Sequence, residues 1–427
     1  FIKGVTSAYY DHDGRPDLVV GAHSVNKSWM ERHVGAVYVF FGPLAPGDMN
    51  AADADAIVLG AHADDRLGIR LVVADFDLDG YADVAADAPQ ASKPDGSRPC
   101  CGELAILRGS RLAAGGTVDL AIEPTAVMTR VYGPTSQGTG MMCGVATALQ
   151  VATAYDPYAA GDVNGDLRPD LALASDLDPT GDRPHAGIID VFLAADVGAP
   201  FPAVIDRRDD RGQLTILGRA ADYGLGHQLA IADIDADAYG DVVAGAPAAP
   251  GASGRLAAGQ VVVAFGAAGR GPREVDLADA LDSEAVFLYG PEIGTQLGMT
   301  VATAFLNGDG SADILAGGGI QRIRGTDLVA YPGEVHVVLG STSMASRDLA
   351  VYPPDLLILG ADALDPLRAS DEDNVVDFAG WSISDGDLDG DTFGDIVVGV
   401  PGGDGPDESR WEAGETAVVF GGEPFTP

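Results

Sequence analysis

The chain has 427 residues, of which 46% are hydrophobic, so it can bury a sizeable core. Asp and Glu number 64 against 25 Lys and Arg, giving a net charge of −39. This acidity argues against nucleic acid and anionic membranes as partners, because both need a basic surface. No run approaches the roughly 18 apolar residues of a membrane-spanning helix, so none is predicted.

The chain opens with Phe1-Ile2-Lys3-Gly4. This is not a signal peptide, and we expect the sequence to be a processed or trimmed one that begins inside a repeat. The scarcity of Lys beside many Asp is also compatible with a halophilic source or a calcium-rich medium.

Asp-rich loops recur six times along the chain, each followed by a short apolar strand. In the full pattern, oxygen-bearing side chains occupy positions 1, 3, 5 and 9 of a nine-residue loop, and the backbone carbonyl of position 7 completes the set. Clustered carboxylates repel one another unless a hard cation such as Ca²⁺ binds them. The pattern therefore predicts calcium in these loops, four to six ions in all.

The predicted ligands fall into six groups, taken in chain order. They are Asp11, Asp13 and Asp17; Asp75, Asp77, Asp79, Tyr81 and Asp83; Asp162, Asn164, Asp166, Arg168 and Asp170; Asp233, Asp235, Asp237, Tyr239 and Asp241; Asn307, Asp309 and Asp313; and Asp387, Asp389, Asp391, Phe393 and Asp395. Tyr81, Arg168, Tyr239 and Phe393 are expected to act through their backbone carbonyls.

The loops differ in completeness. The loops that begin at Asp75, Asp233 and Asp387 have four carboxylates and should bind calcium most tightly. The first and fifth have Tyr9 and Phe305 at position 1 and should bind weakly or with water. The alternative is a plain Asp-Gly hairpin turn, which needs one or two such residues rather than four at fixed spacing. An EF-hand is excluded because position 12 is apolar instead of a bidentate Glu.

Each repeat has four strand-like pieces that are short, rich in β-branched residues and bounded by Gly, Pro or Asp. The pieces that follow the loops are apolar on both faces, so both faces must be covered. Four-stranded sheets packed face to face around an axis provide that cover. We therefore predict an all-β fold, a single β-propeller of six four-stranded blades at about 1–60, 61–133, 134–218, 219–290, 291–360 and 361–427, with seven blades as the alternative.

The sixth blade lacks a visible fourth strand. We expect that strand to come from a segment before Phe1, from the tail after Gly421 or from another chain.

Two short motifs resemble FG-GAP repeats, the propeller family of integrin α-subunits and many bacterial extracellular proteins. They are Phe-Gly at the end of the third strand and Gly-Ala-Pro after the second, as in Gly245-Ala246-Pro247. The resemblance covers essentially the whole chain. It implies calcium in the loop between the first and second strands, and it is specific to fold and metal rather than to activity.

Long connections opposite the calcium loops are the expected binding face, because long loops on a rigid scaffold often carry function. They contain Trp29 and Trp411, whose side chains could stack on a sugar or anchor a partner. The alternative is that each Trp packs its own loop. The acidic insertion 361–379 could bind another cation or be a solvated loop.

The three cysteines, Cys100, Cys101 and Cys143, lie in links predicted on the same face of adjacent blades. We expect Cys143 to pair with Cys100 or Cys101 in an extracellular setting. A vicinal Cys100–Cys101 bond and three free thiols are the alternatives.

No catalytic motif of contiguous residues is present: there is no H-E-x-x-H, no G-x-S-x-G and no phosphate-binding Gly loop with Lys. We therefore expect a non-enzymatic, calcium-binding, extracellular adhesion or binding module with a protein or glycan ligand. A subunit of a surface assembly belongs to the same class. The alternative is an enzyme that acts on a polysaccharide or a phosphoester, with a site on the central loop face.

Overall fold

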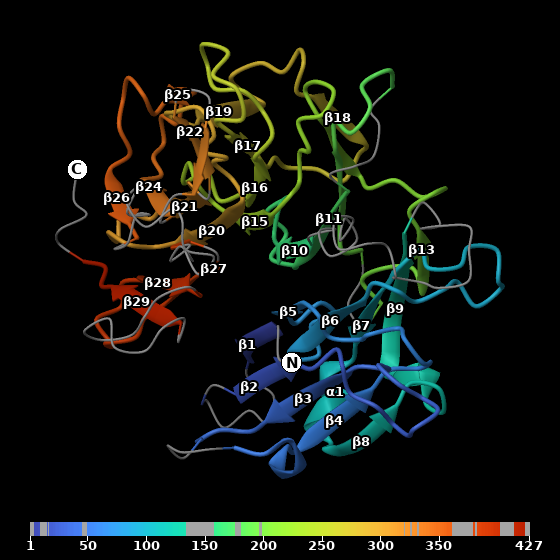
Figure 1. Cartoon of the computed structure of the whole chain (residues 1–427). Helices are drawn as coiled ribbons and strands as arrows, with labels where there is room; N and C mark the ends of the chain where they lie inside the picture. Colours follow the sequence, from blue (N-terminus) through green and yellow to red (C-terminus); the bar gives the residue numbers. More distant parts are fainter. Residues whose placement is uncertain are drawn as a thin grey trace. The chain divides into compact units, whose positions relative to one another are not determined.

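The computed structural model describes most of the chain (Figure 1). The described residues are 4–8, 15, 17–44, 49–133, 158–175, 181–195, 199–319, 321–324, 327–330, 333–360, 379–380, 382–401 and 414–422. The chain forms two compact units. One comprises Phe1–Ala154, Arg168–Leu171 and Phe192–Gly212, and the other comprises Tyr155–Leu167, Ala172–Val191 and Gln213–Pro427.

The fold is all-β, as predicted, and six small sheets form the six blades of a β-propeller. Helical pieces in the described residues are short: η1 (Ala51–Asp53), α1 (Gly109–Ala113) and η2 (Pro124–Ala126). None of the helices described here is long and apolar enough to span a membrane.

The first unit contains two sheets. In pairing order, the first is β1 (Gly4–Ala8), β2 (Asp17–Gly21), β3 (Ala36–Phe40), β4 (Ala56–Leu59) and β8 (Gly116–Asp119), and the second is β5 (Leu71–Ala74), β6 (Asp83–Ala88), β7 (Glu103–Leu107), β9 (Val127–Tyr132) and β13 (Val204–Asp206). The two sheets share one apolar core, in which Val37 and Val39 of β3 and Val84 and Ala86 of β6 are completely buried. Both faces of the second strands are therefore covered, as their apolar sequences require.

The second unit contains most of the third sheet and the whole of the other three. The third is β10 (Tyr158–Gly161), β11 (Asp170–Ser175), β12 (Ile188–Phe192), β14 (Leu214–Leu217) and β18 (Arg273–Asp276), and the fourth is β15 (Leu229–Ala232), β16 (Asp241–Ala246), β17 (Gln260–Ala264), β19 (Ala285–Tyr289) and β25 (Arg347–Asp348). The fifth is β20 (Thr300–Ala304), β21 (Asp313–Gly318), β24 (Glu334–Val338) and β26 (Leu356–Leu359), and the sixth is β27 (Ser382–Gly386), β28 (Asp395–Val400) and β29 (Glu415–Val419). A separate hairpin, β22 (Gln321–Arg324) and β23 (Asp327–Ala330), lies between β21 and β24 in the sequence.

Small residues at the end of the second strand let the next sheet approach closely. A Cβ built on Gly245 would lie 2.0 Å from the carbonyl oxygen of Gly298, at the start of the next sheet. The Gly of the Gly-Ala-Pro motif is thus a packing requirement. Among the described residues the sixth sheet has three strands, and the source of its fourth strand stays a prediction.

Four sheets have a fifth strand that the repeat pattern did not reveal. In each case it pairs in parallel with the fourth strand and comes from the following repeat, between that repeat's third and fourth strands: β8 on β4, β13 on β9, β18 on β14 and β25 on β19 (Figure 1). These strands have two to four residues, too few for an alternation of apolar and polar residues to be recognised.

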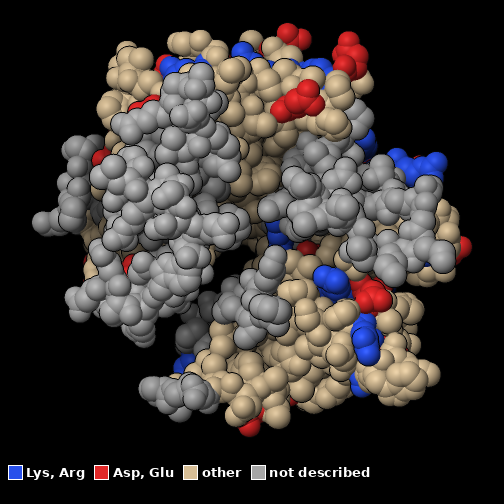
Figure 2. Space-filling model, in the orientation of Figure 1, with Lys and Arg blue, Asp and Glu red and all other residues tan. Residues whose placement is uncertain are grey.

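An aspartate ends each of these fifth strands and pairs with a cation from the sheet that the strand joins. We call these ion pairs the clasps: Lys27–Asp119 at 2.6 Å, Lys93–Asp206 at 2.8 Å together with Arg98–Asp206, Arg183–Asp276 at 2.7 Å, and Arg255–Asp348. Each cation lies in the link between the second and third strands. Figure 2 shows Lys and Arg side chains lying beside Asp and Glu on the visible face.

Replacing the clasp aspartate in Asp276→Asn should lower the stability of the protein. Arg183 donates two hydrogen bonds to the Asp276 carboxylate, at 2.8 and 2.7 Å, and this pairing lowers the pKa of Asp276. Because both groups are partly exposed, we expect a loss of about 1 kcal/mol, or roughly 2–4 °C in melting temperature. The exposed Asp282→Asn is the control; equal melting temperatures for the two variants would contradict a stabilising clasp.

Candidate metal centres

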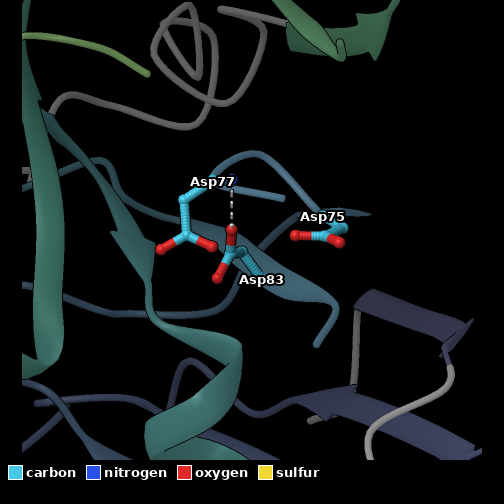
Figure 3. A group of neighbouring side chains, drawn as sticks. All are labelled: Asp75, Asp77 and Asp83. Carbon is cyan, nitrogen blue, oxygen red and sulfur yellow. Dashed lines mark hydrogen bonds between the residues drawn. The ribbon is translucent and has the colours of Figure 1, made fainter. Parts of the chain in front are cut away.

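Three of the predicted loops bring carboxylates together. The groups are Asp75, Asp77 and Asp83; Asp233, Asp235 and Asp241; and Asp387, Asp389 and Asp395, and in each the three carboxylate oxygens lie within 4.8 Å of one another. Figure 3 shows the first group, in which the backbone N–H of Asp77 also donates to Asp83. The structure thus joins positions 1, 3 and 9 of the loops, the arrangement that oxygen-binding divalent cations favour.

The aspartate at position 9 is buried in all six repeats and ties the loop to the sheet. Asp17, Asp83, Asp170, Asp241, Asp313 and Asp395 are at most 1% exposed. In each, Oδ1 accepts a hydrogen bond of 2.7–3.0 Å from the backbone N–H of the second residue after the third strand. In four of them Oδ2 also accepts from the N–H of position 2. This residue therefore has a structural role besides that of a possible ligand.

The Gly of the Phe-Gly motif follows from the same contact. Gly266 donates its N–H to Asp241, and a Cβ on Gly266 would lie 2.5 Å from the carbonyl oxygen of Gly240, at position 8 of the loop. At Gly421, the equivalent Cβ would lie 2.3 Å from the carbonyl oxygen of Gly394. The motif is thus the place where the strand end meets the loop.

Positions 1 and 5 organise the loop backbone. Asp233 accepts from the N–H groups of Asp237 at 3.1 Å and Ala238 at 2.8 Å, and Asp75 and Asp387 make the same contacts. Asp237 accepts from the N–H of Tyr239 at 2.9 Å, as Asp79 and Asp391 do from position 7. Position 5 is not part of the three-carboxylate groups, so its ligand role, like that of the carbonyls of Tyr81, Tyr239 and Phe393, stays a prediction.

In the third and fifth loops, the candidate ligand oxygens contact other side chains of the protein. In the third loop, Arg270 pairs with Asp166, and Arg168 donates to the carbonyl of Ala195. In the fifth, the amide of Asn307 donates to Asp309 at 3.0 Å. In the first, Asp11 and Asp13 lie outside the described residues.

The electrostatics of the groups favour a bound cation. The pKa of Asp235 is raised by burial and then by Asp237 and Asp233, and that of Asp77 by burial and then by Asp79. Oδ1 of Asp235 is buried and has no hydrogen-bond partner. A buried, unpaired carboxylate oxygen is costly, and a divalent cation would satisfy it. The residues present therefore fit Ca²⁺.

The other predicted residues are only partly described. Trp29 is 78% exposed, as a ligand-binding side chain would be, whereas Trp411 lies outside the described residues. Cys100 is disulfide-bonded, and Cys101 is a free, buried thiol whose pKa is raised by burial. Cys143 also lies outside the described residues, so the predicted pairing stays a prediction.

Two exposed histidine–aspartate pairs were missed by the sequence analysis. Nδ1 of His33 lies 3.0 Å from Asp64, and Nδ1 of His185 lies 2.9 Å from Asp222. The pairs occupy equivalent places in two repeats: each His is two residues before the Gly that precedes the third strand. The carboxylate orients the imidazole and leaves Nε2 able to accept or donate a proton. An alignment of the repeats would have revealed the two histidines, because both have the same spacing to the third strand.

Comparison with known proteins confirms the predicted kind of repeat. Residues 379–416 match the FG-GAP repeat. Together with the six-bladed fold, this match shows an FG-GAP β-propeller.

Four curated relatives share one name, phosphatidylinositol-glycan-specific phospholipase D. The human protein is 30% identical over 194 residues, covering 44% of this chain and 20% of that protein. The mouse protein is 28% identical over 218 residues, covering 50% and 21%. The chain thus spans about a fifth of the length of the curated relatives that it matches.

Among solved structures, rhamnogalacturonan lyase PL11 of Bacillus licheniformis is 12% identical, with a TM-score of 0.34 over 74% of this chain and 55% of that one. The exotype rhamnogalacturonan lyase YesX is 14% identical, with a TM-score of 0.36 over 98% and 65%. Similarity this low says nothing about activity.

The expectation that the chain is not an enzyme is wrong on this evidence, because its curated relatives are named for an enzyme. The expectation relied on the absence of contiguous catalytic motifs. In a propeller, side chains from separate repeats can form a site, so spacing within one segment does not reveal it.

Removing the buried carboxylate in Asp241→Ala should destabilise the protein even in excess chelator. The change leaves the buried N–H groups of Gly266 and Ile234 without an acceptor, at a cost of about 2–4 kcal/mol. The position-5 variant Asp237→Ala is the control. The N–H of Tyr239, which donates to Asp237, is exposed and can bond to water instead. Equal melting temperatures in chelator would show that Asp241 acts only through a metal.

Metal-free protein should lose stability as the pH rises from 5 to 8. Burial raises the pKa of Asp83 and of Asp241 to about 7 and that of Asp313 to about 6, against 3.8 for an ordinary aspartate. Folding therefore favours the protonated carboxyls, and this contribution is lost as the pH rises through the folded-state values. Added calcium should reverse the trend, because protons compete with it. A melting temperature in chelator that rises from pH 5 to 8 would contradict the assignment.

Proposed function

We propose that this chain is the calcium-stabilised propeller of an enzyme that acts on a phosphoester, of the kind named phosphatidylinositol-glycan-specific phospholipase D. The observation that carries the proposal is the match of about half of the chain to four proteins of that name. The matched region is about a fifth of the length of those relatives. We therefore assign the activity to the whole enzyme that contains the propeller.

The described surface offers groups suited to such a substrate. In the pairs His33–Asp64 and His185–Asp222 the imidazoles are 41% and 60% exposed, so they can reach a ligand and transfer a proton. Trp29 offers an aromatic face for the glycan, and it lies in the same link as His33. We assign the glycan contact to this link.

We propose that calcium binds the loops at Asp75, Asp233 and Asp387 and stabilises the blades rather than performing chemistry. Each site lies between a loop and the end of a buried strand, and the position-9 aspartate belongs to both. An extracellular location agrees with a calcium requirement and with the disulfide at Cys100.

Removal of calcium should lower the melting temperature by clearly more than the roughly 2–4 °C that corresponds to 1 kcal/mol in a large domain. Ions that bind the folded loops but not the unfolded chain stabilise by linkage, and several sites add. The measurement is thermal unfolding in calcium and in excess chelator, with magnesium as the control for ionic strength. An unchanged curve would contradict the assignment.

The phosphoester activity can be tested on the native protein that contains this sequence. Antibodies against the chain should recover an activity that hydrolyses a phosphatidylinositol-glycan, and Trp29→Ala should raise the KM for that substrate. The exposed Val351→Ala is the matched control. A recovered protein that cleaves neither this substrate nor simpler phosphodiesters would refute the proposal.

A further inference from the structure

The outer edge of β26 in the fifth sheet lacks a neighbour among the described residues. In four of the other sheets the fourth strand has a parallel fifth strand on this edge. β26 consists of four apolar residues, of which Leu357 is 42% and Leu359 56% exposed. In β19 of the fourth sheet, by contrast, Phe287, which has the same place in its strand as Leu357, is only 7% exposed. An apolar strand edge with unpaired backbone groups is a template for another strand.

The four covered edges share one register. The clasp aspartate stands opposite the last residue of the fourth strand: Asp119 opposite Leu59, Asp206 opposite Tyr132, Asp276 opposite Leu217 and Asp348 opposite Tyr289. The next residue donates its N–H to the carbonyl of that fourth-strand residue, at 3.1 Å in all four cases. The geometry of the covering strand is therefore set by the edge that it joins.

The four covering strands also have similar sequences. Val118-Asp119-Leu120 and Val275-Asp276-Leu277 have an apolar residue before the aspartate and a leucine after it, and all four flanking side chains are at most 4% exposed. The other two strands keep the aspartate with one of these neighbours, Ile205 or Leu349. All four covering strands thus combine an aspartate with at least one apolar neighbour, and two of them have the full pattern apolar–Asp–Leu.

We propose that the outer edge of β26 is a docking edge for an extended peptide segment of this pattern, which adds in parallel with its aspartate opposite Leu359. The apolar residue then stands opposite Ile358, and the residue after the aspartate donates its N–H to the carbonyl of Leu359. This interaction surface is independent of the loop carboxylates and of the phosphoester activity.

The test uses the whole chain and a synthetic peptide of residues 271–280, which contains Val275-Asp276-Leu277. We expect saturable binding by calorimetry and slower amide hydrogen exchange in Leu356–Leu359. Leu359→Asp should weaken binding about tenfold or more, because it opposes the peptide carboxylate. Val351→Asp, which changes an equally exposed residue away from the edge, should leave binding unchanged. Both positions are exposed, and circular dichroism checks that the variants fold.

A peptide with Val275→Lys and Leu277→Lys serves as the sequence control and should not bind. Absence of binding by the original peptide, or protection elsewhere than β26, would overturn the proposal. Self-association of the chain that Leu359→Asp abolishes, without peptide binding, would assign the edge to a second copy and would also overturn it.

Discussion

The buried aspartate at position 9 is the interaction on which each repeat depends. It lies at the start of the second strand, and its carboxylate joins that strand to the second residue after the third strand and, in four repeats, to the start of the Asp-rich loop. A carboxylate can be buried only if its oxygens are satisfied. Backbone N–H groups satisfy part of this need, and a cation in the loop would satisfy the rest. A cation bound in the loop would therefore couple metal binding to the fold at this residue.

The clasps provide a second kind of connection, between consecutive repeats. Four repeats lend a strand to the sheet before them, and the aspartate at the end of that strand pairs with a basic side chain of that sheet. In a chain with only 25 Lys and Arg, this use of Lys27, Lys93, Arg98, Arg183 and Arg255 is a substantial share. Within each unit, these repeats are thus joined by paired backbone and paired charge, and the first and second sheets, like the fourth and fifth, also share an apolar core.

The sheets and Asp-rich loops form a repeated frame, and the links between strands differ from one repeat to another. The frame repeats the same contacts, whereas the links carry the features that differ from one repeat to another, such as Trp29 and the His33–Asp64 and His185–Asp222 pairs. The relatives are named for an enzyme, whereas the repeated sheets alone do not indicate an activity. Fold and activity are separate questions in a propeller, because the activity depends on side chains in the links.

By itself, the sequence determined the blades and the candidate ligands, since these depend on local patterns: four oxygens at fixed spacing, apolar strands behind them, and Gly where backbones meet. Only the tertiary structure decided which oxygens converge, namely those of positions 1, 3 and 9 in the loops that begin at Asp75, Asp233 and Asp387. It also decided that β8, β13, β18 and β25 join the preceding sheets. Those strands are too short to show a period, and their partners, such as Leu59 for Asp119, lie far away in the chain. Pairing of that kind is set by packing between repeats rather than by neighbouring residues.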